Sequence, residues 1–140
     1  AVHPRHLAKY LTSLYAIMEK YKLEFSIWGH AGDGNVHMQP FLDLGDTNDL
    51  EKLFAAAGEV YGLVLKFHGT LSAEHNDGLM RLPYLEMEFG SDMMSVFSRV
   101  KSTFDPQDIF NPGKKMSWSL DSIKKLLRKD YIIDIGSQRL

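Results

Sequence analysis

The sequence predicts an α+β fold, in which amphipathic helices surround two short strands joined by a glycine-rich loop. Apolar residues recur at every third or fourth position over residues 4–21 and 46–65, which is the spacing of one helix face. They alternate with polar residues over 23–28, which is the spacing of one strand face. Because 140 residues suffice for one core, we expect one domain over residues 1–116. A helical tail over 117–140 would follow it, as a linker to any downstream domain.

The first half of the domain is expected to run helix, strand, loop, strand. The helix begins near Pro4, which suits a first helical turn because its missing N–H costs little there. Its apolar stripe consists of Leu7, Leu11, Leu14, Met18 and Tyr21. The apolar face of the first strand consists of Leu23, Phe25 and Ile27. A second strand over 36–41 is closed by Pro40.

The second half is expected to be mainly helical. Asp46, Thr47 or Asn48 caps the next helix. Its stripe consists of Leu50, Leu53, Phe54, Ala57, Tyr61, Val64 and Leu65. A third helix over 91–103 should bury an apolar face formed by Met93, Val96, Phe97, Val100 and Phe104. An Asn-Pro-Gly turn then precedes a last helix over 119–129.

The composition excludes several classes of function. The chain has 16 Lys and Arg against 18 Asp and Glu, so it lacks the basic excess of a general nucleic-acid or anionic-membrane binder. Because it has no cysteine, these residues hold no disulfide, thiolate metal site or iron–sulfur cluster. No apolar run approaches the roughly 18–20 residues of a membrane span. We expect a cytoplasmic protein, associated with a membrane only through partners.

The loop between the strands carries the first candidate metal ligands. Asp33 and Gly34 form a favoured two-residue hairpin turn. A turn centred on them predicts three cross-strand pairs: Gly32 with Asn35, Ala31 with Val36, and His30 with His37. Opposed side chains lie about 5 Å apart, so His30 and His37 could share a divalent metal, with Gln39 on the same face. The alternative is a hairpin with two surface histidines and no ion.

A third ligand is expected from the polar stretch Ser72–Gly78. Glu74 offers a carboxylate, and two histidines with one carboxylate leave positions on a metal open to substrate oxygens. His75 would then be placed to abstract a proton. Neighbouring side chains of a strand point to opposite faces, so a turn is required if both residues face one site. The alternative is that both are ordinary loop residues.

Three further residues are candidates for contacts with anions. Arg81 could hold a substrate carboxylate, although a surface arginine needs no ligand. Asn111 begins the Asn-Pro-Gly turn, and Lys114 follows it. Together they could approach a phosphate or a flavin, although the same residues also form an ordinary turn.

Three stretches taken together resemble the C-terminal domain of FAD-linked oxidases, in the vanillyl-alcohol oxidase superfamily. They are Gly29–His37, Ser72–His75 and Phe104–Lys114. The resemblance covers about residues 2–116 and points to D-lactate dehydrogenases, glycolate oxidases and D-2-hydroxyglutarate dehydrogenases. It implies a ferredoxin-like antiparallel sheet with helices packed on one face. This domain would cover a flavin held mainly by a separate N-terminal domain.

The resemblance also implies a role for each candidate residue. His30, His37 and Glu74 would bind a divalent metal, with zinc expected first and manganese or iron as alternatives. His75 would remove the hydroxyl proton of the substrate. Substrate contacts would come from Asn35, Gln39 and Arg81, and FAD contacts from Asn111 and Lys114. Two residues depart from the family pattern: Asn76, where glycine is common, and Gln39, where the hydroxyglutarate enzymes have asparagine.

These inferences predict the C-terminal substrate- and metal-binding domain of an FAD-dependent D-2-hydroxy-acid dehydrogenase of the D-lactate or glycolate class. The enzyme would oxidise the acid to a 2-oxo acid by hydride transfer to flavin, and this chain alone should be inactive. The expected partners are the 2-hydroxy acid, an N-terminal FAD-binding domain, an iron–sulfur domain or subunit, and a second copy in a homodimer. The alternatives are a stand-alone metal-binding module and a metal-dependent hydrolase with His75 as base.

Overall fold

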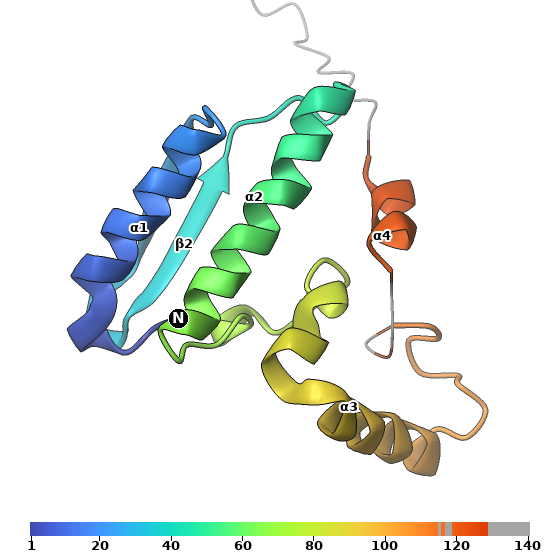
Figure 1. The fold of residues 1–140 in the computed structure, drawn as a ribbon. Helices are drawn as coiled ribbons and strands as arrows, with labels where there is room; N and C mark the ends of the chain where they lie inside the picture. The colour runs from blue at the N-terminus through green and yellow to red at the C-terminus, as the bar shows by residue number, and fades with distance from the viewer. Residues whose placement is uncertain (115, 117–118, 129–140) are drawn as a thin grey trace, which may run out of the picture.

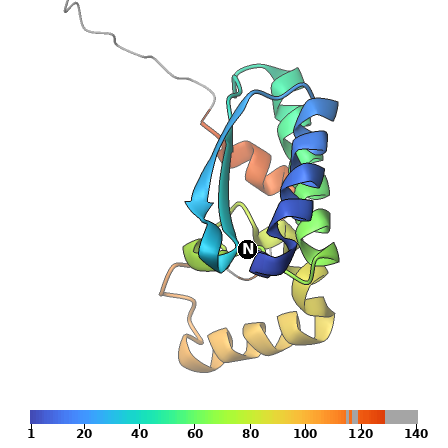
Figure 2. The ribbon, with the colours of Figure 1, turned by 90° about the vertical axis from the view of Figure 1, so that its left-hand side faces the viewer.

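Two helices pack on one face of a two-stranded antiparallel sheet (Figure 1, Figure 2). The computed structural model describes residues 1–114, 116 and 119–128. This layered unit, called the sandwich below, consists of α1 (Leu7–Lys20), β1 (Phe25–His30), β2 (Asn35–Pro40) and α2 (Thr47–Lys66). The helix–strand–strand–helix order is the centre of a ferredoxin-like βαββαβ unit. The predicted α+β class, with both helices on one face of an antiparallel sheet, is confirmed.

The core lies where α1 and α2 meet the sheet. Each helix buries residues spaced by four, which lie in one row along the helix: Tyr10, Leu14 and Met18 in α1, and Ala56, Val60 and Val64 in α2. The expected stripe of α1 is therefore centred correctly on Leu14 and Met18. The most buried row of α2 is rotated by one position from the expected one, although Ala57 and Tyr61 still pack against the core.

The hairpin register differs from the expected one. His30 lies opposite Asn35, so the prediction that it opposes His37 is wrong, as are the other two predicted pairs. A two-residue turn of the expected type needs positive φ at both central residues, and of the two only Gly34 has it, at +64°. Residues Ala31–Asp33 form a 3-10 turn, so the loop is longer by two residues than predicted.

The third helix, α3 (Leu85–Phe104), lies at the end of the sandwich and runs across the direction of α1 and α2 (Figure 2). It starts six residues earlier than expected and is interrupted at Gly90, whose φ of +75° and ψ of 161° are accessible essentially to glycine alone. The prediction that its apolar face is buried is wrong, because the described chain covers only part of it. Each of Met93, Val96, Phe97, Val100 and Phe104 is at least 36% exposed.

The last described helix, α4 (Leu120–Leu126), contacts α2. The Ser119 side chain caps it by accepting a backbone N–H, and Ile123 is fully buried. The ammonium group of Lys124 lies 5.4 Å from the ring centroid of Phe54 in α2. The predicted final helix is thus present over these seven residues.

The predicted helical tail is only partly within the described chain. Residues 117–118 and 129–140 lie outside the described residues, and the domain boundary at residue 116 stays a prediction. Among the helices that the structure describes, none is both long enough and apolar enough to cross a membrane.

Candidate active site

Three predicted ligands converge at one end of the hairpin. His30 ends β1, His37 lies in β2, and Glu74 lies in the 3-10 turn Ala73–His75. One donor atom from each residue lies within 4.8 Å of the other two. Glu74 Oε1 is 2.9 Å from His37 Nε2 and 3.5 Å from His30 Nε2. The structure therefore brings together two nitrogens and one carboxylate oxygen from three separate segments.

Both histidines stay on one sheet face despite the changed register. Side chains alternate with a period of two along a strand, so a shift of two residues changes the partner but not the face. His30 is consequently diagonal to His37, with ring centroids 5.7 Å apart. Diagonal neighbours remain within reach of long side chains, so the two imidazoles can still face one ion.

The turn required at Glu74 and His75 is present. The 3-10 turn bends the chain so that both side chains face the hairpin, and hydrogen-bonded Ser72 and Asp77 side chains close it. The next residue, Asn76, has φ +61° and ψ −175°. This conformation costs a non-glycine residue about 1–3 kcal/mol and is found mainly where the surroundings enforce it.

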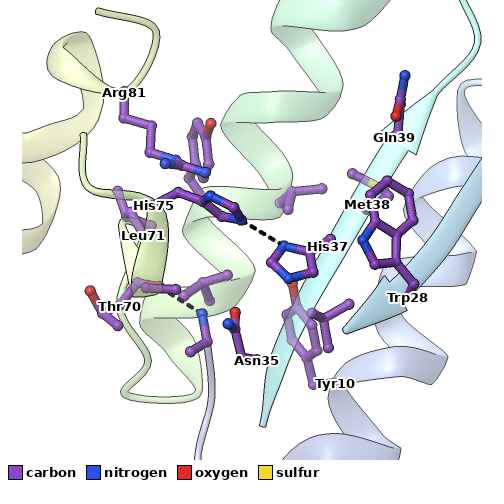
Figure 3. Close-up of a pocket in the computed structure, with 16 residues that line it drawn as sticks. Tyr10, Trp28, Asn35, His37, Met38, Gln39, Thr70, Leu71, His75 and Arg81 are labelled. Carbon is purple, nitrogen blue, oxygen red and sulfur yellow. Dashed lines mark hydrogen bonds between the residues drawn. The ribbon is translucent and has the colours of Figure 1, made fainter. Parts of the chain in front are cut away.

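His75 contacts the candidate ligands themselves. Its Nε2 lies 3.0 Å from His37 Nδ1 and 3.4 Å from Glu74 Oε1 (Figure 3). One of the two facing ring nitrogens therefore donates to the other. A partner of this kind fixes the orientation of a metal-binding histidine. The His75 side chain is also 56% exposed, which leaves it accessible to a bound molecule.

A pocket of about 380 Å³ opens beside these residues (Figure 3). His37 and His75 line one side, and the guanidinium of Arg81 lies next to His75. Arg81 donates to the backbone carbonyl of Asn76 and is hydrogen-bonded to Tyr61. The volume suits a small organic acid, and a guanidinium held in place can bind a carboxylate.

The two amide residues predicted to contact substrate occupy different positions. Asn35 is buried and lines the pocket near its base (Figure 3). Gln39 is exposed and lies farther along β2, away from His75 (Figure 3). The structure thus brings Asn35 close to the histidines and leaves Gln39 at the rim of the same pocket.

Asn111 and Lys114 are not brought to this pocket. They line a second cavity of about 660 Å³, between the C-terminal half of α3 and the loop that follows it. Asp105 organises that loop: its carboxylate accepts the backbone N–H groups of Ile109 and Phe110 and pairs with Lys101. The hydrogen bond from Lys101 holds the pKa of Asp105 below its usual value.

Sequence reasoning missed three aromatic residues of the first pocket. Trp28 lies opposite His37, and their ring centroids are 5.8 Å apart; the wrong register concealed this contact. Tyr61 was assigned only to the core face of α2. Tyr10 also lines the pocket, and burial raises the pKa of its hydroxyl to about 12. The predicted stripe of the first helix did not include Tyr10, which is buried, and helical periodicity placed Tyr61 on an inward face without indicating that its hydroxyl reaches a cavity.

Comparison with known proteins identifies the family. The family described as FAD linked oxidases, C-terminal domain, matches residues 1–115. The chain belongs to this family. It is 34% identical over 115 residues to glycolate oxidase subunit GlcD of Bacillus subtilis (strain 168), which is 81% of this chain and 24% of that protein. It is 33% identical over 114 residues to D-2-hydroxyglutarate dehydrogenase of Pantoea ananatis (strain AJ13355), 81% of this chain and 11% of that protein.

A third relative has another substrate in its name. The chain is 34% identical over 113 residues to D-lactate dehydrogenase of Archaeoglobus fulgidus, which is 81% of this chain and 25% of that protein. The expected membership of the FAD-linked oxidases is thus confirmed. This FAD-linked oxidase domain spans a quarter or less of each of these three relatives.

Proposed function

We propose that this chain is the substrate- and metal-binding part of an FAD-dependent enzyme that oxidises a small D-2-hydroxy acid to the 2-oxo acid. The observation that carries the proposal is the convergence of His30, His37 and Glu74 beside a pocket that contains Arg81. The reaction class is supported by the names of the relatives, which are oxidases or dehydrogenases of glycolate, D-lactate and D-2-hydroxyglutarate. FAD would be held mainly by another domain of the intact enzyme.

The donor set fits a divalent metal. Ligands placed tetrahedrally at 2.0–2.1 Å from zinc are about 3.3–3.4 Å apart. The separation of 3.5 Å between His30 Nε2 and Glu74 Oε1 matches this value, and the 2.9 Å from His37 Nε2 is shorter by a few tenths of an ångström. Zinc is the first choice, and manganese and iron accept the same ligands. When bound, the metal would orient the substrate and make its hydroxyl easier to deprotonate.

Each of the remaining residues of the site has a separate role toward the substrate. His75 accepts the hydroxyl proton at a ring nitrogen, which requires that it release its hydrogen bond to His37. Arg81 binds the substrate carboxylate, and the amide of Asn35 and that of Gln39 offer further polar contacts along β2.

FAD, when bound, would supply the acceptor for the hydride that leaves the substrate carbon. Asn111 and Lys114 would contact it from the second cavity, where Lys114 offers a positive charge. Since the chain contains no cysteine, an iron–sulfur relay would have to lie in another domain or subunit. The elements of the described residues belong to the sandwich and the helices that follow it, and none of them forms a separate flavin-binding fold. We therefore expect no turnover by this chain alone.

The test is the metal content and metal affinity of the purified chain. We expect about one equivalent of zinc, and at least a tenfold loss of affinity in each of His30→Ala, His37→Ala and Glu74→Gln. His3→Ala removes an exposed histidine outside the cluster and serves as the matched control. Unchanged zinc affinity in all three variants would reject the metal site.

Two further variants separate the roles of the neighbouring residues. His75→Ala should retain zinc, because His75 is proposed as base rather than ligand. Arg81→Ala should also retain zinc but weaken the binding of D-lactate to the zinc-loaded chain by about tenfold, measured by shifts of the histidine ring signals in NMR. Arg5→Ala is the control for loss of a positive charge. Equal D-lactate affinity in the Arg81 and Arg5 variants would remove Arg81 from the proposed site.

A further inference from the structure

Trp28 places a large aromatic ring in the wall of the pocket that the candidate ligands share. The residue is 52% exposed, and among the exposed large apolar residues of the described chain it is the one that lines this pocket. A single exposed aromatic residue on a protein surface is common and needs no ligand. Its place in the pocket distinguishes Trp28 from the other exposed aromatic residues.

Strand pairing fixes the position of the Trp28 ring. The residue is directly opposite His37 across the hairpin. Their ring centroids are 5.8 Å apart, and the ring planes are tilted by 36°. His30 follows Trp28 by two residues in β1, so both side chains point to the same face of the sheet. The ring therefore lies against one candidate metal ligand and beside another, on a strand rather than on a loop.

The polar groups of the pocket lie on the other side of His37. The ring of His75 contacts that of His37, with centroids 4.7 Å apart. Across the pocket, Figure 3 shows four side chains in the order Arg81, His75, His37 and Trp28. The row thus has a guanidinium at one end and an exposed aromatic ring at the other.

The groups of a 2-hydroxy acid match this order. Its carboxylate and its hydroxyl are on adjacent carbon atoms, so they are bound close together, as Arg81 and His75 are. One 2-hydroxy acid differs from another in the remaining substituent of the hydroxyl-bearing carbon. That substituent projects away from the two polar groups, and the Trp28 ring is the exposed apolar surface at the far end of the row.

We propose that Trp28 determines the substrate class, because its ring packs against an apolar side chain of the D-2-hydroxy acid. This inference rests on the proposed function, since it requires an acid bound at His75 and Arg81. The class consists of acids whose side chain is larger than the methyl group of D-lactate and is aromatic or branched aliphatic. Packing such a side chain on the ring removes apolar surface of both from water, and two aromatic rings add a further attraction.

The same ring disfavours a side chain that carries a second carboxylate. The face of an aromatic ring is the negative part of its quadrupole, and a carboxylate there would lose water without gaining a positive partner. Glycolate has a hydrogen atom in place of the side chain and would leave the ring of Trp28 in solvent. Of the acids named for the three relatives, D-lactate is therefore the one closest to the proposed class.

The experiment compares three acids that differ only in this side chain: D-lactate, D-3-phenyllactate and D-2-hydroxyglutarate. Their affinities for the zinc-loaded chain are measured by NMR, from the histidine ring signals and the indole N–H signal of Trp28. The sequence has two tryptophans, so this signal is assigned by its loss in Trp28→Phe. We expect D-3-phenyllactate to bind at least about tenfold more tightly than D-lactate. D-2-hydroxyglutarate should bind more weakly than D-lactate.

Variants of Trp28 test whether the ring causes this preference. The ratio of the D-3-phenyllactate and D-lactate affinities should fall to about threefold or less in Trp28→Ala and in Trp28→Thr, which keeps a residue suited to a strand. Trp28→Phe keeps a ring and should retain a ratio of at least about fivefold. Phe41→Ala removes another exposed aromatic ring, four residues beyond His37 and outside the pocket, and should leave the ratio unchanged. A ratio is used because any change at the zinc site or at Arg81 affects both acids alike.

Two results would overturn the proposal while leaving the proposed function intact. One is equal affinity of the unsubstituted chain for D-lactate and D-3-phenyllactate, with D-lactate binding still dependent on Arg81. The other is a preference for D-3-phenyllactate that persists in both Trp28→Ala and Trp28→Thr. Absence of binding of all three acids to the zinc-loaded chain would instead reject the acid-binding site of the proposed function, and this inference with it.

Discussion

The helices of the sandwich and α3 have similar apolar sequence patterns, but the apolar residues are buried in the sandwich and exposed in α3. In α1 and α2 the apolar row faces the sheet and the other helix, and Leu14 and Met18 are fully buried. In α3 the apolar row is equally regular, but Val100 is 52% exposed and Phe104 is 81% exposed. A helical repeat thus identifies which face is apolar, but it does not identify what covers that face.

The chain changes direction within α3, at Gly90. Gly90 adopts a backbone conformation that interrupts α3, and the following turns run across the end of the sandwich rather than along it (Figure 1). Such a face in one part of a larger protein is commonly an interface. In the FAD-linked oxidases, a family whose members are several times longer than this segment, we expect another part of the enzyme to cover it.

The largest expected effect contrasts one buried residue with one exposed residue. Leu14→Ala should lower the free energy of unfolding by about 2–5 kcal/mol, because it leaves a cavity between α1 and α2. Phe104→Ala should change it by no more than about 0.5 kcal/mol, since the side chain is mostly in solvent. Urea unfolding followed by circular dichroism measures both. Losses of similar size would mean that α3 is as much a part of the folded core as α1.

The next effect concerns how the helices begin. Asp46 caps α2 by accepting the N–H groups of Asn48 and Asp49, whereas no side chain caps the start of α3. Asp46→Ala should therefore cost about 1 kcal/mol of unfolding free energy. Asp46→Asn, which keeps an acceptor, should cost less than half as much in the same urea experiment. Equal losses would indicate that charge rather than capping stabilises α2.

A third prediction tests the exposed face of α3. We expect the 140-residue chain to self-associate through it, because contiguous exposed apolar surface favours association. Val100→Lys should lower the weight-average mass in sedimentation at high protein concentration while leaving the unfolding free energy within about 0.5 kcal/mol. Lys22→Glu, on the turn after α1, is a control for a surface charge change. A concentration-independent mass in the unsubstituted chain would contradict this prediction.

The smallest expected effect is a pH dependence of the unfolding free energy of the sandwich, caused by Glu59. Hydrogen bonds from Lys20 and then Tyr21 lower the pKa of Glu59 from its ordinary 4.5. The folded state therefore favours the carboxylate, so this stabilisation is complete above pH 4.5 and is lost as pH falls through the lowered pKa. Glu59→Gln should reduce the slope of stability against pH below 4.5, measured by urea unfolding between pH 3 and 7. An unchanged slope would mean that these exposed contacts add nothing.

The sandwich could be predicted from the sequence because its elements are defined locally. Period-four rows in α1, alternation in β1 and a cap at Asp46 each depend on residues close in the chain. The hairpin register could not be predicted from the Asp33–Gly34 pair, since the backbone angle of Asp33 decides the turn. The exposure of the apolar face of α3 follows from the direction that the helix takes after Gly90, which helical periodicity does not report.

The candidate site was predictable for a related reason. His30 and His37 remain on one face under any shift of two residues, so the pairing error did not separate them. The approach of Glu74 and His75 is a long-range contact: their residue types made them candidates, with ordinary loop residues as the alternative, and the resemblance to a family then favoured the site. Lys114 shows the reverse case: the turn before it is local and was predicted, but the separate cavity that it lines depends on where α3 leads the chain.

The carboxylate of Asp105 has a consequence for the aromatic rings beside it. It holds the backbone of Ile109 and Phe110 by two hydrogen bonds and is itself tied to Lys101. The loop that carries the exposed Phe110 ring is therefore ordered before anything covers it. Ordered groups lose less conformational entropy on association than mobile ones. A buried acid thus lowers the entropic cost of covering the Phe110 ring, although its own carboxylate is not part of the exposed surface.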